Sequence, residues 1–455
     1  MKKRFLKSLQ DKDFSELFNK GSMSFLMRVG GQIIGFIFTF IIARFFGASG
    51  LGDYILAIIV LRIFVLFAKL GMDIASIRFI ASLSIKQHWR QITVYRKQVI
   101  RILLLTTTVL SLVMYFFAEP IASFVGTKTL YIQFNAFFIF PMSIFILNYQ
   151  SLRGLKEITS FSFFNWMSRL LFSIVIILIA VQFSQDEKIP IFAFLFGLVL
   201  ASIFSQITFN ISIKRRLKDN KVQRLTSKIF TVKSILVVSL PLMFAQSGQF
   251  IMAWIDKLML GGMIDSSEVG IYDVAFKLSM IIGIALTSVT SITSPKFAEV
   301  YANNEFNRLE KVVRQSTKLT VWSSLPICLI LLLLSSNVLG LFGNDFQEGQ
   351  LVVFILCFAR IITAFLGPAG NLLQMTGRQV IYMNILIVGA IINFGLNLIL
   401  IPENNLLSDY GISGIEGAAV ASMCSLVFWN LSMVYYVKRE FGFWTIYNPF
   451  KVNNV

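Results

Sequence analysis

Eight basic residues lie within the long apolar stretches of this chain, where a charged side chain is costly and is usually kept for a function. Arginine binds phosphate through the two prongs of its planar guanidinium, whereas lysine presents a compact point charge. These residues are therefore the first candidates for chemistry, with structural pairing or contact with lipid headgroups as the alternative. They are Arg28, Arg62, Lys69, Arg78, Arg169, Lys257, Lys277 and Arg360.

Acidic residues accompany several of these cations. Asp73 follows Lys69 by four residues on the same helix face, so the two can neutralise each other as a structural pair. Asp256 and Lys257 are adjacent near the outer end of their stretch and are either a gate or an interfacial pair. A proton carried by Asp73 or Asp273 is one form of ion coupling. We assign gating or ion coupling to Asp73, Asp273, Asp256 and Lys257.

Histidine and cysteine chemistry is not expected. The single histidine, His88, lies in a polar segment. Cys328, Cys357 and Cys424 fall inside apolar stretches and show neither metal-site nor disulfide spacing. The sequence therefore predicts no metal site, no cofactor and no catalytic residues.

The composition indicates that these residues belong to a membrane protein. Hydrophobic residues make up 56% of the chain and charged residues 14%, with a mean hydropathy of +0.75. So few charges could not cover a soluble protein of 455 residues. A span needs about 20 apolar residues, and twelve such stretches predict an all-α membrane protein. They are 24–46, 54–82, 98–118, 129–150, 161–183, 190–212, 233–260, 269–293, 316–342, 348–373, 379–401 and 414–437.

The basic residues between the stretches fix an orientation. Thirty of them fall in one set of alternate loops and in the two ends of the chain. Only Arg44, Lys128 and Lys188 fall in the other set. Because basic loops stay in the cytoplasm, both termini are predicted to be cytoplasmic. The net charge of +18 then reflects topology and anionic lipid headgroups, and no nucleic-acid partner is expected.

The two halves of the chain resemble each other. Gly52 and Gly270 each begin a Gly-x-Tyr sequence that opens the next stretch, and Gly154 and Gly377 follow equivalent stretches. Similar shifts relate both pairs, which predicts two six-helix lobes about a two-fold axis along the membrane normal. The predicted parts are an N-terminal tail (1–23) without a cleaved signal peptide, a first lobe (24–213), a linker (214–232), a second lobe (233–437) and a C-terminal tail (438–455).

Several motifs resemble the polysaccharide transporters, or oligosaccharide flippases, of the superfamily that also holds the multidrug and toxin extruders. The matching residues are Ala43 to Gly47 with Gly52-Asp53-Tyr54, Pro241-Leu242, Asp256-Lys257, Gly261, Val269 to Tyr272, Ala275, Lys277, Ser294-Pro295, Tyr301, Leu373, Gly377-Arg378, Gly414 and Gly417 to Ala421. The resemblance implies about 12 helices in two lobes around a central cavity. It also implies that alternating access carries an undecaprenyl-diphosphate-linked oligosaccharide across the bacterial cytoplasmic (inner) membrane.

Such a substrate has an anionic diphosphate, a polar glycan and an apolar tail. Arg62 lies deep in its stretch, and the repeat places Lys277 at a similar depth on the symmetry-related helix. We therefore expect Arg62 and Lys277 to face each other and to contact the diphosphate. Further expected contacts to diphosphate or sugar are Arg28, Lys69, Arg169 and Arg360, although Arg28 could instead reach the headgroups and Arg169 and Arg360 could be structural. Membrane lipids, a polysaccharide polymerase and chain-length proteins are the other expected partners.

Two other functions compete with this interpretation. A cation-coupled multidrug exporter of the same superfamily would favour carboxylates over arginines in its cavity. A polysaccharide polymerase or ligase would carry catalytic residues on a large outer loop, and the longest outer loop here runs only from Pro402 to Ser413. The sequence therefore favours a transporter that is not an enzyme.

Overall fold

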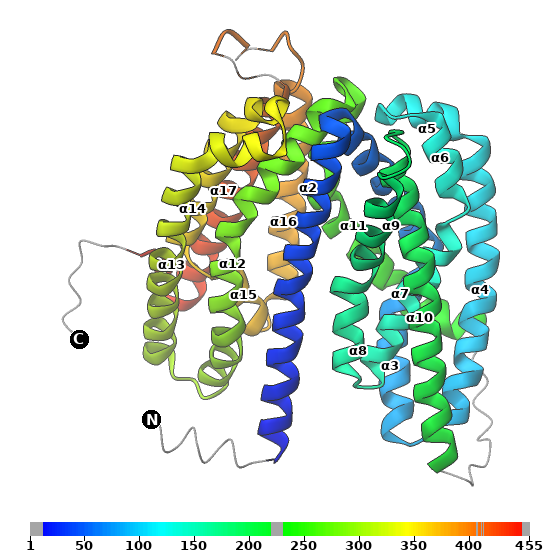
Figure 1. The fold of residues 1–455 in the computed structure, drawn as a ribbon. Coiled ribbons are helices and arrows are strands. Elements are labelled where there is room, and N and C mark those ends of the chain that lie inside the picture. Colours follow the sequence, from blue (N-terminus) through cyan, green and yellow to red (C-terminus); the bar gives the residue numbers. More distant parts are fainter. Residues whose placement is uncertain (1–11, 220–230, 406–407, 411, 413, 448–455) are drawn as a thin grey trace. The chain divides into compact units, whose positions relative to one another are not determined.

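The computed structural model describes residues 12–219, 231–405, 408–410, 412 and 414–447, which form helices and no strand. These residues group into two compact units. Unit 1 holds the described residues up to Phe46 and Asp53–Phe250, and unit 2 holds Gly47–Gly52 and the described residues from Ile251 onward. Two helices, α2 (Lys12–Ala68) and α11 (Val232–Met263), both labelled in Figure 1, therefore contribute residues to both units.

The remaining elements belong to one unit each. Unit 1 contains α3 (Met72–Ile85), α4 (Trp89–Phe116), α5 (Ala118–Val125), α6 (Thr129–Ala136), α7 (Ile139–Gly154), α8 (Ile158–Phe163), the π-helix η1 (Phe164–Ser168), α9 (Arg169–Ala180) and α10 (Ile189–Asp219). Unit 2 contains α12 (Ser266–Ala302), α13 (Phe306–Phe342), the 3₁₀-helices η2 (Asn344–Gly349) and η3 (Ser408–Tyr410), α14 (Gln350–Leu366), α15 (Ala369–Met375), α16 (Gln379–Leu400) and α17 (Gly414–Phe441).

The expected all-α membrane fold is confirmed. In the described part of the chain, nine helices are long and apolar enough to cross a membrane, or eleven if each of two bent helix pairs is one span. One bent pair is α6 with α7, which meet at 54°. Helix α2 runs through the first predicted stretch and most of the second, and its backbone leaves helical geometry at Gly47 (φ 69°, ψ −172°). Counted as two spans, α2 brings the total to the expected twelve.

Two glycines from the sequence repeat touch each other in unit 2. A Cβ on Gly52 would lie 1.5 Å from the carbonyl oxygen of Ser266, and one on Gly270 would lie 2.2 Å from that of Ala48. Only residues without a side chain permit this approach. The Gly47–Gly52 segment of α2 therefore crosses the first turn of α12 backbone to backbone, which explains why it belongs to unit 2.

A predicted boundary was wrong at the third stretch. It was expected to begin at residue 98, with Arg96 in the preceding loop, but α4 begins at Trp89 and Arg96 is 6% exposed. The Arg96 guanidinium donates to the amide oxygens of Asn148 and Gln206 and lies 3.7 Å from the ring centre of Phe209. Hydropathy missed this turn because its polar side chains point into unit 1.

Of the three basic residues in the other set of loops, Lys128 and Lys188 are paired with carboxylates. Lys128 forms an ion pair with Glu187 and lies 3.4 Å from Asp53, and the hydrogen bond to Glu187 raises the pKa of Lys128. Lys188 lies 3.5 Å from Asp186, whose pKa is lowered by a hydrogen bond from the Lys188 backbone. Pairing in the connections before α6 and α10 therefore explains how these cations are tolerated.

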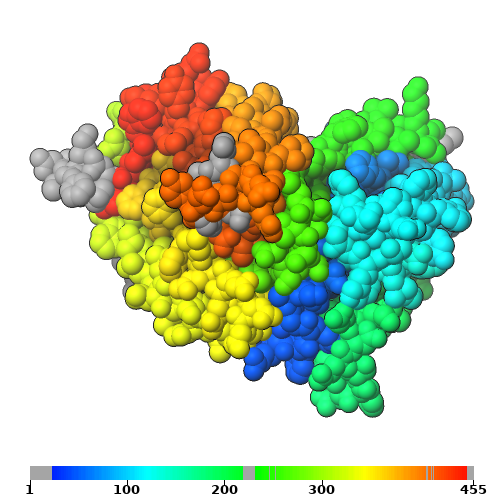
Figure 2. Space-filling view, turned by 90° about the horizontal axis from the view of Figure 1, so that it is seen from above, coloured from blue at the N-terminus to red at the C-terminus, as the bar shows by residue number. Residues whose placement is uncertain are grey.

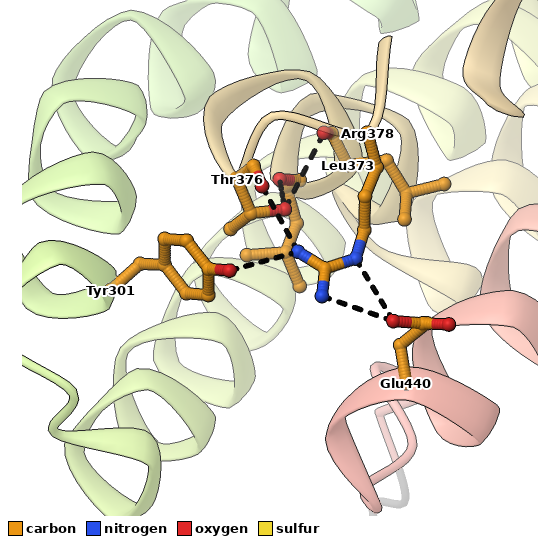
Figure 3. Close-up of polar contacts among 6 residues, drawn as sticks. Tyr301, Leu373, Thr376, Arg378 and Glu440 are labelled. Carbon is orange, nitrogen blue, oxygen red and sulfur yellow. Dashed lines mark hydrogen bonds and ion pairs between the residues drawn. The ribbon is translucent and has the colours of Figure 1, made fainter. Parts of the chain in front are cut away.

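One end of unit 2 gathers carboxylates, and the other is joined by an ion pair. Glu348, Glu403 and Glu416 act electrostatically on Glu268. Glu348 belongs to η2, Glu403 to the α16–α17 connection and Glu416 to the first turn of α17, and the first two segments are yellow and orange in Figure 2. At the other end, Arg378 donates to Glu440, to the Tyr301 hydroxyl and to the Thr376 carbonyl (Figure 3). Arg378 thus joins α12, the α15–α16 turn and α17.

The residues after α17 pack back onto unit 2. Helix α14 ends at Leu366 because Gly367 has φ 79° and Pro368 follows. The break leaves C-terminal carbonyl groups without helical donors. The Thr445 hydroxyl donates to Leu366 O at 2.6 Å, and the Tyr447 backbone N–H donates to Phe365 O at 3.0 Å. Residues Gly442–Tyr447, here called the C-terminal strap, therefore cap the broken helix.

The strap predicts a sharp difference between two substitutions. Replacing the fully buried Thr445 by Val keeps its shape but removes the donor to Leu366 O, which should destabilise unit 2 by about 1–3 kcal/mol. Replacing it by Ser keeps the hydroxyl and should change much less. Thermal unfolding in detergent measures both variants. Equal midpoints for Val and Ser would contradict the capping role.

The glycine crossing predicts a second pair of outcomes. Gly270→Ala places a methyl group against the backbone of α2 and should destabilise the protein by about 1–3 kcal/mol or prevent its accumulation. Gly283→Ala is the matched control, because a Cβ there meets no atom within 4 Å. Thermal midpoint and membrane yield are the measurements. A Gly270 variant as stable as the Gly283 variant would show that the crossing is loosely packed.

Candidate functional site

A cavity of about 100 Å³ lies inside unit 2, among five helices. Its walls combine apolar and aromatic side chains with a few polar and charged groups, the composition typical of small-ligand sites. The lining residues come from α11 (Ala253, Asp256, Lys257), α12 (Tyr272, Phe276), α14 (Arg360), α16 (Ala390, Asn393) and α17 (Ser422, Ser425, Leu426, Trp429).

Asp256 anchors one wall of this cavity through neutral donors. It accepts hydrogen bonds from the Tyr272 hydroxyl at 2.9 Å, from the Asn397 amide at 2.7 Å and from the Ser422 hydroxyl. Among the described residues no cation lies within ion-pairing distance of Asp256. Three helices, α12, α16 and α17, thus hold this carboxylate through neutral donors.

Asp273 holds two lysines. Its carboxylate lies 2.5 Å from Lys257 Nζ and 2.6 Å from Lys277 Nζ. Asp273 is 2% exposed and Lys257 is 5% exposed, whereas the side chain of Lys277 is 35% exposed. Lys257 also lies 4.8 Å from the ring centre of Trp254 and 5.1 Å from that of Phe276. Lys257 is therefore fixed inside unit 2, and Lys277 is the more accessible of the two.

Arg360 adds a further cation to the cavity. Its guanidinium lies 5.8 Å from the ring centre of Phe276, a cation–π contact. No carboxylate among the described residues lies within 4 Å of it. The site in unit 2 combines two carboxylates with three cations and so carries a net positive charge. The cations are Lys257, Lys277 and Arg360.

Unit 1 holds a separate group of charges. Lys69 and Asp73 are both buried and form an ion pair at 2.7 Å, as the structural-pair alternative expected. They flank the break between α2 and α3, where Leu70 and Gly71 both have positive φ. Asp73, Arg62 and Arg169 all act electrostatically on Tyr149 of α7. The structure therefore brings Arg62, Asp73 and Arg169 together in unit 1.

Two arginines of unit 1 lie against aromatic rings. Arg169 lies 5.0 Å from the ring centre of Phe194, and its buried Nε has no hydrogen-bond partner among the described residues. Arg28 is exposed and lies 5.2 Å from the ring centre of Trp166. Neither has a carboxylate within 4 Å in the part of the chain that the structure describes.

The expected facing of Arg62 and Lys277 stays a prediction, because Arg62 belongs to unit 1 and Lys277 to unit 2. Each unit gathers several of the predicted residues of its own half, while Arg28 lies against Trp166 and Lys69 pairs with Asp73. Asp256, Lys257, Asp273, Lys277 and Arg360 share the site in unit 2, and Arg62, Asp73 and Arg169 share the group in unit 1.

Sequence reasoning missed the hydrogen-bonding residues around Asp256. Tyr272 was read as part of a motif, and Ser422 and Asn397 were not singled out. One signal was present: Asn393 and Asn397 lie one helical turn apart within an apolar stretch, and the two side chains hydrogen-bond at 3.3 Å. Polar pairs at this spacing on a membrane helix indicate an inward-facing site.

Among the described residues, no group of three or more His, Cys, Asp or Glu is placed to hold a metal ion. The charged groups of both units are single carboxylates and cations, some of them neighbours on one helix, as Asp273 and Lys277 are on α12. What they provide chemically is charge and hydrogen bonding at membrane depth.

Two family models match this chain. The model described as "Polysaccharide biosynthesis protein" matches residues 17–300, and the model described as MatE matches residues 241–399.

Curated relatives match at low identity. The probable low-salt glycan biosynthesis flippase Agl15 of Haloferax volcanii is 24% identical over 241 residues, covering 53% of this chain and 47% of the relative. The capsular polysaccharide biosynthesis protein CapF of Staphylococcus aureus is 23% identical over 295 residues, covering 64% of this chain and 70% of the relative. The match thus spans about half of the archaeal flippase.

Solved structures of transporters share the fold. The lipid II flippase MurJ in an inward closed conformation aligns with a TM-score of 0.67 at 17% identity, covering 91% of this chain and 87% of that one. An inward-facing multidrug resistance MATE family transporter of the MOP superfamily aligns with a TM-score of 0.68 at 14% identity, covering 92% and 98%. These likenesses establish the fold.

Because Asp273 pairs with two lysines, removing its charge is expected to lower the stability of the protein strongly. Asp273→Asn leaves the buried Lys257 without its counter-charge and should destabilise the protein by about 3–5 kcal/mol. The double variant with Lys257→Met removes the orphaned charge and should regain part of the loss. Thermal unfolding of the purified protein tests this coupling. Additive losses in the double variant would mean that the pair contributes nothing to stability.

Proposed function

Because this chain belongs to the polysaccharide biosynthesis protein family, we propose that it is a flippase for undecaprenyl-diphosphate-linked oligosaccharide. It carries an O-antigen, capsule or exopolysaccharide repeat unit across the membrane and makes no covalent change to it. The names of the matched relatives, which include flippases for glycan biosynthesis, support this class of substrate.

One observation carries the proposal: arginines lie inside apolar helices without a counter-charge. Arg28 and Arg169 in unit 1 and Arg360 in unit 2 contact aromatic rings, and no described carboxylate lies within 4 Å of them. Arg169 and Arg360 are partly buried, and an isolated cation there is costly unless a partner arrives, whereas Arg28 is exposed and already open to a ligand. A diphosphate supplies that partner, and arginine binds it through two parallel hydrogen bonds.

Within this function, Arg62 and Lys277 are the proposed main contacts to the diphosphate. Lys277 shares Asp273 with Lys257, and its side chain is 35% exposed, so it is the more accessible of the two lysines. Arg28, Lys69, Arg169 and Arg360 are the proposed secondary contacts to diphosphate or sugar. Lys69 is the weakest of these, because its ammonium already pairs with Asp73 at 2.7 Å.

Asp256 is the proposed site of ion coupling. Of the four residues assigned to gating or coupling, Asp73 and Asp273 are paired with lysines and Lys257 is paired with Asp273. Asp256 alone faces the cavity with neutral donors only, among the residues that the structure describes. Gaining a proton or a cation there would change its hydrogen bonds to α12, α16 and α17, which is a direct way to bias one packing of unit 2 over another.

Transport is proposed to proceed by alternating access. Helices α2 and α11 each contribute residues to both units, and both bend where they do so, α2 at Gly47 and α11 between Gly248 and Ala253, where its two segments meet at 60°. The positive-inside charge pattern supports a bacterial cytoplasmic membrane with both termini in the cytoplasm. A polysaccharide polymerase and chain-length proteins are the proposed functional partners, since they would consume the exported repeat unit.

A cation-coupled multidrug exporter is the second candidate, and the MATE-like fold favours it. Such a transporter binds cationic substrates and therefore needs carboxylates free in its cavity. In unit 2 the cavity holds more cations than carboxylates. This balance favours the anionic substrate. A polymerase or ligase is a weaker third candidate.

Charge removal tests the proposed site. Arg62→Ala or Lys277→Ala should lower the surface polysaccharide of the producing cells at least about tenfold, because a hydrogen bond to a charged group contributes about 1.5–3 kcal/mol. Arg78→Ala, at an exposed position on α3, is the matched control and should leave export unchanged. Protein level in the membrane is measured beside export. Full export by both site variants at normal protein levels would reject the diphosphate contact.

A further inference from the structure

Trp166 has an unusual position in unit 1. It lies in η1, five residues of π-helix between α8 and α9, and such insertions occur frequently at functional sites. Its indole is half-buried, and the exposed Arg28 guanidinium of α2 lies 5.2 Å from its ring centre. The pair is thus accessible at least on the arginine side.

Close backbone packing fixes this arrangement. A Cβ on Gly31 would lie 2.6 Å from the carbonyl oxygen of Trp166, so only glycine lets α2 approach η1 this closely. The Ser162 hydroxyl donates to Ser24 Oγ at 2.8 Å one turn away. The backbone of Trp166 is therefore held against α2, and Arg28, three residues before Gly31, reaches its ring.

Charge distinguishes this pair from another arginine–indole contact in the same unit. Arg216 lies 5.3 Å from the ring centre of Trp89 and also pairs with Glu157 at 3.1 Å. That guanidinium is neutralised and has a structural role between α10 and its neighbours. Arg28 has no carboxylate within 4 Å among the described residues, so it keeps a full charge beside an aromatic surface.

We propose that Arg28 and Trp166 form a subsite for the junction between diphosphate and glycan, with Arg28 on a phosphate oxygen and Trp166 against the first sugar. This inference rests on the proposed flippase function and specifies how the sugar is recognised. A pyranose ring has an apolar C–H face, which packs on the broad face of an indole while its hydroxyls stay hydrated. The guanidinium can stack on an indole and still direct its N–H groups to a phosphate.

The subsite makes affinity depend on the presence of a sugar. Trp166 should matter only for a lipid that carries a sugar, whereas Arg28 should matter for every lipid with the diphosphate. A purely structural contact between α2 and η1 would not separate the two lipids.

Binding to the purified full-length protein in nanodiscs tests this separation with two probes, undecaprenyl diphosphate and undecaprenyl-diphosphate-linked N-acetylglucosamine. Trp166→Leu should weaken binding of the sugar-bearing lipid about tenfold, the equivalent of about 1.4 kcal/mol, and leave undecaprenyl diphosphate unchanged. Trp166→Phe keeps a smaller ring and should lose less. Arg28→Gln should weaken both lipids, and Trp89→Leu, the control for loss of an indole, should weaken neither.

The outcomes separate the subsite from the function. If the wild-type protein binds both lipids and Trp166→Leu or Trp166→Phe changes both equally or not at all, the subsite is rejected and the flippase proposal stands. If the wild-type protein binds neither lipid, the flippase proposal fails and the subsite fails with it. The Phe variant, which retains aromatic packing against α2, decides the question if the Leu variant does not fold.

Discussion

A charge placed inside an apolar helix bundle needs a counter-charge, hydrogen-bond donors or acceptors, or a ligand, and this requirement explains the interior of both units. Lys69 with Asp73, and Lys257 with Asp273, meet it by ion pairing. Arg96 meets it with the amide oxygens of Asn148 and Gln206. Arg169 and Arg360 meet it only in part, through aromatic rings, and the exposed Arg28 also lies against a ring. The difference divides the cations into those that hold the fold and those that remain available to an anion.

The backbone is arranged to place these charges. In unit 2 the crossing of Gly52 and Gly270 positions the start of α12, one turn before Tyr272 and Asp273. In unit 1 the positive φ angles at Leu70 and Gly71 end α2 beside Lys69, and the π-helix η1 presents Trp166 to Arg28. Breaks in membrane helices are tolerated where their backbone groups find partners, as the strap residue Thr445 provides for α14. Each irregularity therefore lies next to a charged or capping side chain.

Much of the fold could be predicted from the sequence, because a membrane-spanning helix is recognised by a simple requirement, a sufficient length of apolar residues. Apolar length located the helices, and the repeat of Gly52 and Gly270 marked positions that are now seen to touch. Charged residues were recognisable as site candidates because their cost in an apolar stretch is independent of the fold. The hydrogen-bond partners of these charged residues were not recognisable. Asp256, for example, accepts hydrogen bonds from Asn397 of α16 and Ser422 of α17, which are far away in the chain. Arg96 was misplaced because hydropathy cannot detect a helix turn whose polar face is buried.

The central claim is that this chain moves an anionic, lipid-linked sugar rather than a cationic small molecule. Transbilayer movement of a fluorescent undecaprenyl-diphosphate-linked sugar in proteoliposomes that contain the purified protein tests this claim most directly. The account predicts movement faster than in protein-free vesicles, and no inhibition by a lipophilic cationic dye. Dye uptake without movement of the lipid-linked sugar would contradict it.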